Sequence, residues 1–302
     1  MEACDVRSRP RRLRLAAVEM EAAPKRARAG GGEAPDRLSA LPDELLHRVF
    51  SFLPSQQAVQ TTVLSKRWID LWRSMPAINL NIKEFECRSP APGQYEKTRW
   101  GKMENFTTNL LMRHKAPRLD AFRLSTGSIR VDWRRDVDRW IRRAIEYRPV
   151  ELHIRLPAAR LGAPYPYQLP KPFSCHLKRL VLSGVSLGYI FGEQLRSECP
   201  VLEDLQLWRC REFSGLHSDT LKKLNVVDCS DGAADKLVIR APSLASLYLS
   251  LHRNGVLLYT EKFLAEAWIL GSDQLSRRGE AILLGSLFNV MSLELVCFSA
   301  MV

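Results

Sequence analysis

A short leucine pattern recurs from residue 119 toward the C-terminus, and it constrains the fold more than any other feature of the chain. The pattern is Leu, two residues, Leu, one residue, Leu. Clear copies start at 119, 177, 202, 221 and 244, and looser copies start at 149, 264 and 290. In chain order the starts are 30, 28, 25, 19, 23, 20 and 26 residues apart. A repeat of about 20–29 residues is typical of a solenoid, in which each unit packs only against its neighbours.

Each copy also has the period of a half-buried strand. Leu-x-Leu puts two leucines on one side of a pleated strand and the residue between them on the other. We therefore expect a solenoid of the α+β or α/β class, with a parallel sheet on its concave face and the leucines in one continuous core. The residues predicted to line the concave face are Arg123, His153, Val181, Gln206, Asn225, Tyr248, Trp268 and Glu294, with Trp208 one period further along its strand.

Three of these residues are large aromatics: Trp208, Tyr248 and Trp268. Exposed aromatic side chains in a concave wall suit the binding of a partner or ligand. A second interpretation stays open, because a register shifted by one residue would exchange the two faces and bury all three side chains. A loop covering them would also make them part of the core.

Residues 37–80 have a helical rather than a strand period. The segment Pro42–Glu44 opens a helix, since proline suits the first turn and acidic residues favour the positive end of the helix dipole. Pro54 ends that helix, and Ser55 and Ser65 are placed to cap a second and a third short helix. Three short helices bury little surface by themselves, so their leucines and tryptophans indicate a partner.

Residues 1–36 are rich in Arg, Ala, Gly and Pro without an apolar period, which predicts a disordered basic arm. Its clusters Arg9–Arg12 and Lys25–Arg28 fit a nuclear import signal or an ordinary solvated tail. The chain as a whole has a net charge of +12. No secretory signal opens it, and its seven cysteines lack the spacing of a metal or redox pair. We therefore expect a protein of the nucleus, the cytoplasm or both.

The segment Leu283–Val302 is apolar and as long as a membrane span. Glu294 near its middle would cost about 2.5–3.5 kcal/mol on insertion. The repeat copy that starts at Val290 explains the segment better, so we expect no membrane contact; a tail anchor is the alternative. No polar cap follows this copy, which predicts repeats that are truncated at the C-terminus.

Two motifs carry a resemblance to a known family. Leu41–Leu46 (Leu-Pro-Asp-Glu-Leu-Leu), followed by Leu64–Trp68 (Leu-Ser-Lys-Arg-Trp), resembles the F-box of plant F-box/leucine-rich-repeat proteins. Cys199–Leu205 and Ala241–Leu244 resemble the repeats of the same family. The resemblance implies a three-helix F-box at 37–80, a linker and first repeat cap at 81–115, and leucine-rich repeats at 116–302.

Members of this family are substrate receptors of SCF-type ubiquitin ligases, so the resemblance implies a chain without catalytic residues, cofactor or metal. The F-box would bind the Skp-type adaptor and, through it, the cullin and RING subunits, while the repeats would bind an unknown protein substrate. The implied adaptor-binding positions are Leu41, Pro42, Leu45, Leu46, Val49, Leu53, Val63, Leu64, Trp68 and Trp72. The pleat of the strands, rather than the resemblance, gives the expected substrate-binding positions, which are Arg123, His153, Gln206, Trp208, Asn225, Tyr248 and Trp268.

Some of the adaptor-binding positions could serve only to pack the three helices together. For Leu46, Phe50 and Leu71, core and interface are equally supported. Trp68 and Trp72 are expected to anchor the partner, because buried tryptophans dominate the energetics of interfaces.

Two other functions compete with the receptor hypothesis. The net charge and the two arginine clusters would suit a basic repeat protein that associates with nucleic acid, but the basic residues are spread along the chain, so we do not expect this partner. The second competing function is that of an F-box protein that binds the adaptor but recruits no substrate. An enzyme is not indicated, since glycine-rich phosphate loops and His-Glu-x-x-His are missing from the sequence and its six histidines have no ligand spacing.

Overall fold

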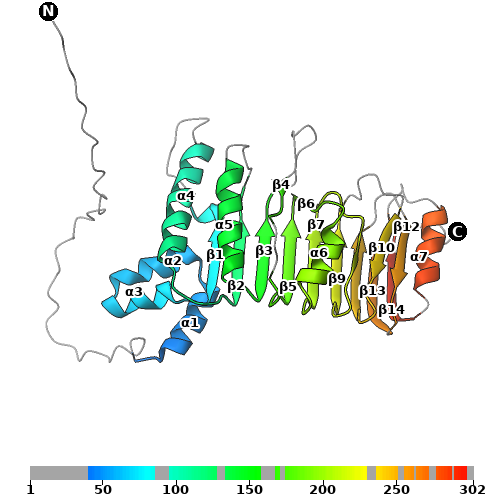
Figure 1. Cartoon of the computed structure of the whole chain (residues 1–302), viewed down its shortest axis with the longest axis horizontal. Coiled ribbons are helices and arrows are strands. Elements are labelled where there is room, and N and C mark those ends of the chain that lie inside the picture. Colours follow the sequence, from blue (N-terminus) through cyan, green and yellow to red (C-terminus); the bar gives the residue numbers. More distant parts are fainter. Residues whose placement is uncertain are drawn as a thin grey trace, which may run out of the picture. The chain divides into compact units, whose positions relative to one another are not determined.

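The computed structural model describes residues 40–85, 95–127, 133–157, 167–170, 174–229, 236–250, 255–261, 263–271, 277–287 and 289–297. The predicted basic arm at 1–36 therefore lies outside the described residues. The compact unit of the chain begins at Pro42. In Figure 1 this unit consists of short helices followed by a row of strands that lie side by side in chain order.

Three short helices come first, and together they are called the helical module. They are α1 (Asp43–Phe52), α2 (Ser55–Gln60) and α3 (Lys66–Arg73), with the 3-10 turn η1 (Thr61–Val63) before α3. Helix α1 buries Leu46 and Phe50, and α3 buries Trp68, whose ring centroid lies 5.5 Å from that of Phe50. The module therefore has a small aromatic core of its own.

One predicted helix cap is wrong. Ser55 is the first residue of α2 and is buried, while Pro54 occupies the N-cap position and its carbonyl accepts the Ala58 N–H at 3.0 Å. The Ser55 hydroxyl instead accepts the backbone N–H of Asn79 at 2.7 Å, outside the helix. Ser65 does occupy the N-cap position of α3, as predicted, but its side chain makes no capping hydrogen bond.

In the part of the chain that the structure describes, the main sheet has nine strands, all parallel, and each pairs with the main-sheet strand that follows it in the sequence. In sheet order they are β1 (Ala77–Asn81), β2 (Ala121–Ser125), β3 (Glu151–Arg155), β5 (Arg179–Ser183), β7 (Asp204–Trp208), β9 (Lys223–Val227), β11 (Ser246–Ser250), β13 (Leu264–Leu270) and β14 (Val290–Val296). The predicted parallel sheet is confirmed, and every predicted repeat copy contains one of its strands from β2 to β14. Strand β1 was not predicted, because no leucine precedes its apolar residues at the repeat spacing.

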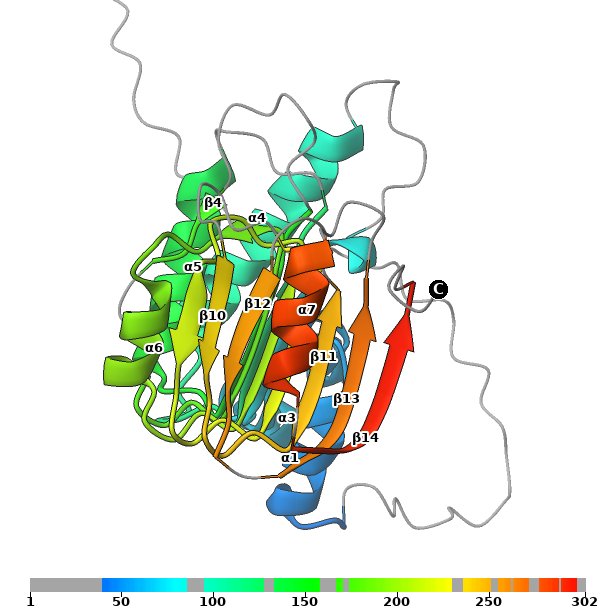
Figure 2. The same cartoon turned by 90° about the vertical axis from the view of Figure 1, so that its right-hand side faces the viewer.

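Parallel pairing requires a crossover connection between each strand and the next one in the sheet. The elements of these connections are η2 (Ile82–Glu84), α4 (Tyr95–Arg113), α5 (Arg134–Glu146), β4 (Tyr167–Gln168), β6 (Val185–Ser186), α6 (Phe191–Glu198), β8 (Gly215–His217), β10 (Lys236–Arg240), β12 (Gly255–Tyr259) and α7 (Arg277–Ser286). Strands β4 and β6 pair with each other, and β12, β10 and β8 form a three-stranded sheet. Figure 2 shows β10 and β12 as a second layer beside β11, β13 and β14.

Among the described residues, the main sheet packs its helices and short strands against one face, and the other face, which they do not cover, is called the open face. On the buried face the leucines of the motif stack into the core; Leu180, Leu182, Leu205 and Leu207 are all fully buried. The residues between the motif leucines share a register row on the open face. From β1 to β14 this row is Asn79, Arg123, His153, Val181, Gln206, Asn225, Tyr248, Trp268 and Glu294.

Val181 is an exception to the predicted exposure of this row. It is only 2% exposed, because it is short and stands between the longer side chains of His153 and Gln206 on the adjacent strands. At the other extreme, Leu293 of β14 is 42% exposed although it occupies a motif position on the core face. Strand β14 is the last in the sheet order, so its outer edge has no strand neighbour among the described residues.

The apolar C-terminal segment folds as part of α7 and as strand β14. Among the described helices, none combines the length and the apolar character needed to cross a membrane. Residues 298–302 lie outside the described part of the chain. The boundaries of the four expected domains remain predictions, with the addition that the first strand of the sheet starts at Ala77, inside the range 37–80.

Candidate functional site

The helical module exposes a set of apolar side chains on its surface. The set, called the helical patch below, consists of Leu45 (49% exposed), Val49 (50%), Phe52 (78%), Val63 (86%) and Leu64 (62%). The first three are spaced by four and three residues along α1, so they share one side of that helix, next to the side that buries Leu46 and Phe50. Apolar exposure of this extent on a small module indicates a surface that binds a partner.

Trp68 and Trp72 do not belong to the helical patch. They are 4% and 5% exposed, and the Trp68 ring packs against Phe50. Their rings fill the interior of the helical module and offer a partner little surface, so their role as adaptor anchors stays a prediction. Leu46, at 1% exposure, is likewise a core residue.

The other predicted adaptor-binding positions differ in exposure. Pro42 is exposed, whereas Leu41 and Leu53 are partly buried. Phe52 was not predicted, although it is among the most exposed apolar residues in the described part of the chain. The signal that could have found it is its spacing of seven residues from Leu45, which places both side chains on the same side of α1.

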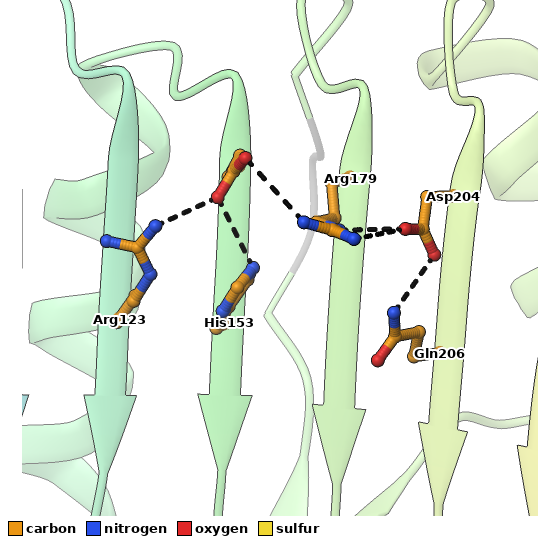
Figure 3. Close-up of polar contacts among 6 residues, drawn as sticks. Arg123, His153, Arg179, Asp204 and Gln206 are labelled. Atoms are coloured by element: carbon orange, nitrogen blue, oxygen red, sulfur yellow. Dashed lines mark hydrogen bonds and ion pairs between the residues drawn. The ribbon is translucent and has the colours of Figure 1, made fainter.

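A chain of polar contacts, called the polar ladder, crosses the open face from β2 to β7. Arg123 Nη2 donates to Glu151 Oε2 at 3.0 Å, and Arg179 Nη1 lies 4.0 Å from Glu151 Oε1. Arg179 also donates from Nε and Nη2 to Asp204 Oδ2 at 2.8 and 2.7 Å. Gln206 Nε2 donates to Asp204 Oδ1 at 3.2 Å (Figure 3). Since two arginines face two carboxylates, the charges of the polar ladder cancel.

His153 lies within the polar ladder as a neutral side chain. Its Nε2 is 3.6 Å from Glu151 Oε2, which is too far for a hydrogen bond. Burial and the neighbouring Arg123 lower the pKa of His153 to about 4, although Glu151 acts in the opposite direction. At neutral pH the imidazole is therefore uncharged, and it separates the two arginines without adding a third positive charge.

The next part of the open face is aromatic. Tyr248 of β11 and Trp268 of β13 are register partners whose ring planes are 12° apart and whose centroids are 4.2 Å apart. Both side chains are partly exposed, as is Asn225, the register partner of Tyr248 on β9. Trp208 is 39% exposed but stands apart, two strands from Tyr248 and in a different register row. The structure thus brings two of the three predicted aromatics together.

The helical patch and the open face are both available for contact with a partner. The helical patch is apolar, and the open face is polar and aromatic. Within the described part of the chain, no group of three or more His, Cys, Asp or Glu side chains is arranged to hold a metal ion.

Comparison with known proteins assigns a family to the helical module. The F-box domain family matches residues 38–78, a range that contains all three helices and the start of β1. F-box domains in general bind Skp1-type adaptors.

Several plant proteins are similar over a longer range. The chain is 35% identical over 224 residues to the MEIOTIC F-BOX protein MOF of Oryza sativa subsp. japonica, which covers 72% of the chain and 46% of that protein. It is 30% identical over 229 residues to an F-box/FBD/LRR-repeat protein of Arabidopsis thaliana, covering 72% and 49%. An F-box/LRR-repeat protein of the same plant is 31% identical over 224 residues, covering 64% and 55%.

The chain spans about half the length of the curated relatives it matches. The F-box match falls on the helices that carry the helical patch, and the similarity to the relatives extends well beyond it. On this combination of motif, fold and similarity, the chain carries an F-box domain and fits the plant proteins of the F-box/LRR-repeat family.

Proposed function

We propose that this chain is the substrate-recognition subunit of an SCF-type ubiquitin ligase and that the helical patch docks on the Skp-type adaptor. The observation that carries the proposal is the exposure of five large apolar side chains on a module matched by the F-box family. Moving such side chains from water into an interface with a partner contributes favourable free energy to binding. Through the adaptor, the chain would be joined to the cullin and RING subunits.

In this proposal the strands after the helical module form a leucine-rich-repeat solenoid, and its open face holds the protein substrate. The strand order, which follows the sequence from β1 to β14, and the repeat names of the relatives support this part. The proposed substrate contacts on the open face are Arg123, His153, Gln206, Trp208, Asn225, Tyr248 and Trp268.

The chain would contribute proximity rather than bond chemistry. A substrate held on the open face and an adaptor held on the helical patch become parts of one assembly, so the substrate lysine meets the ubiquitin-charged enzyme at a high effective concentration. The proposal needs no cofactor, and the expected location is the nucleus, the cytoplasm or both.

The open face gives little support to nucleic-acid binding. Its arginines in the polar ladder are paired with Glu151 and Asp204 and are not available to phosphates without breaking those pairs. The net charge of +12 alone would produce weak binding that falls steeply with salt. A salt titration of any observed nucleic-acid binding therefore separates it from adaptor binding, which should depend little on salt.

The adaptor interaction can be tested by replacing exposed residues only. We expect the wild-type chain to co-purify with the Skp-type adaptor and the double variant Leu45→Asp with Val63→Asp to lose at least about 2 kcal/mol of binding free energy, because each substitution puts a charge into the apolar interface. Isothermal titration calorimetry measures the difference. Replacing Trp68 would be uninformative, since its removal would damage the core of the module.

Tyr189→Asp is the matched control. Tyr189 is also large and 65% exposed, but it precedes α6 and lies outside the helical patch. Its substitution should leave adaptor affinity unchanged. Failure of the folded wild-type chain to bind the adaptor would overturn the proposal, and an equal loss in the Tyr189 variant would show that the helical patch is not the interface.

A further inference from the structure

The open face changes character between β9 and β11. From β2 to β7 it carries arginines that are paired with carboxylates. Strands β11, β13 and β14 contain no lysine or arginine, in a chain whose net charge is +12. Their open-face side chains include the Tyr248–Trp268 stack and two glutamates, Glu266 and Glu294. Lys223 of β9, the register partner of Ser246, is the basic residue that borders these strands on the open face. Beyond it, this end of the sheet is acidic and aromatic.

The two glutamates flank the indole of Trp268. Glu266 precedes it by two residues on β13, so both side chains are on the same face, and the Glu266 Oε1 accepts the Ser246 hydroxyl at 2.7 Å. Glu294 is the register partner of Trp268 on β14 and is exposed. The aromatic–acidic site is defined as Ser246, Tyr248, Glu266, Trp268 and Glu294.

One side of the Trp268 ring is turned toward the acidic strand. Tyr248 lies parallel to the ring on the β11 side, 4.2 Å away between centroids. Since β11 and β14 are on opposite sides of β13, the other ring face is directed toward β14 and Glu294. An aromatic face carries negative potential, and an adjacent carboxylate adds to it. The combination is a recognised environment for a cationic side chain.

We propose that the aromatic–acidic site binds a segment of the substrate protein that carries lysine or arginine. This inference rests on the proposed function, since it names the class of substrate segment that the open face selects. The overall charge of the chain repels a basic segment, so only the local carboxylates and the indole attract it. Basic side chains elsewhere on the chain repel a basic segment. They therefore disfavour its binding at other positions and increase the specificity for the aromatic–acidic site.

A nucleic-acid strand is the less favoured occupant. Its bases could stack on Trp268, as bases do on exposed aromatics. Its phosphates would then approach Glu266 and Glu294 on strands that carry no basic residue. The charge of the aromatic–acidic site therefore selects a basic protein segment.

The test uses the full chain and a fluorescent peptide rich in lysine and arginine, with binding followed by anisotropy. The same peptide with acetylated lysines and neutral residues in place of arginine is the uncharged comparison, and a single-stranded oligonucleotide is the competing probe. We expect the basic peptide to bind and the uncharged peptide to bind at least about tenfold more weakly. Glu266→Gln with Glu294→Gln should weaken the basic peptide about fivefold to tenfold, and Trp268→Leu about tenfold.

The matched control removes two exposed negative charges elsewhere, by Glu96→Gln on α4 with Glu261→Gln before β13, and should leave peptide affinity unchanged. Equal binding of the uncharged peptide, preferential binding of the oligonucleotide, or an equal loss in the control variant would overturn the inference. Adaptor binding is measured on the same preparations. An adaptor-bound chain that ignores the basic peptide contradicts only this inference, whereas a chain that binds the peptide and not the adaptor contradicts only the proposed function.

Discussion

Glu84, the last residue of η2, is a carboxyl group whose surroundings oppose its charge. Burial raises its pKa from 4.5 to about 7, and its Oε2 is buried without a hydrogen-bond partner among the described residues. The folded chain therefore holds a proton on Glu84 that the unfolded chain releases between pH 4.5 and 7. Because the folded state binds more protons in this range, the contribution of Glu84 to stability falls as the pH rises and stays low above pH 7.

The first prediction concerns this carboxyl group. Glu84→Gln keeps the shape of the protonated side chain and removes its titration, so the variant should be more stable than the wild type at pH 8 and similar to it at pH 4.5. Urea unfolding curves at both pH values measure the difference. A stability change of equal size at the two pH values would contradict the assignment of the raised pKa to Glu84.

Individual residue roles were only partly predictable. The alternation of Leu-x-Leu correctly placed Tyr248 and Trp268 on the face opposite the leucines, because a pleated strand has only two sides. The helical module gave less information, since the apolar residues of α1 form one broad side of the helix that contains buried and exposed residues alike. Sequence alone could not show that Trp68 faces Phe50 while Phe52 faces outward, because that depends on how the helices pack against one another.

At the scale of elements, the strands of the main sheet share a motif but not a common degree of burial. Leu180 of β5 is fully buried between neighbouring strands, whereas Leu293 of the final strand β14 is 42% exposed. Both occupy the same motif position in the register. The motif therefore predicts the direction of a side chain, and the place of the strand in the sheet order decides how much that side chain stabilises the fold.

The second prediction compares these two leucines. Leu180→Ala should destabilise the chain by about 2–5 kcal/mol, because it leaves a cavity in the closed core. Leu293→Ala should cost less than about 1 kcal/mol, since water already reaches the side chain. Urea unfolding at neutral pH measures both values. Similar losses in the two variants would show that β14 is as tightly packed as β5, contrary to the difference in exposure between the two leucines.

Strand elements were easier to predict than their connections. Eight of the nine main-sheet strands, all except β1, contain a repeat copy visible in the sequence, because every repeat must present apolar residues to the same core. The connections are α4 and α5 near one end and the short strands β8, β10 and β12 near the other. Nothing in the leucine motif distinguishes a helical from a strand connection, since either one covers the core face.

At the scale of the whole unit, polar contacts that are buried or partly buried join the helical module to the rest of the chain. The Ser55 hydroxyl of α2 accepts the Asn79 N–H of β1 at 2.7 Å, and His114 Nε2 lies 2.9 Å from the carbonyl of Met75. Helices α1 and α2 also pack against β1. We therefore expect the two parts to unfold together, so that a ligase using this chain would hold adaptor and substrate in a fixed relation.

The third prediction tests that link. Ser55→Ala leaves the Asn79 N–H without its acceptor and should cost about 1–3 kcal/mol of stability. Ser51→Ala is the control, since the Ser51 hydroxyl donates only to the Arg48 carbonyl at the surface and its loss should cost less than about 0.5 kcal/mol. Hydrogen exchange should show faster exchange in both α2 and β1 of the Ser55 variant. Faster exchange in α2 alone would mean that the two parts open independently.

The side chains of the register row on the open face are also regularly spaced. Adjacent parallel strands are about 4.8 Å apart, so every second strand offers a side chain about 9.6 Å further along. A substrate in polyproline II conformation returns to the same orientation every three residues, after about 9.3 Å, and stays in phase with alternate strands. A substrate in β conformation repeats its orientation after about 6.7 Å and falls out of phase. If the proposed substrate lies across the strands, the open face would therefore select its backbone conformation as well as its side chains.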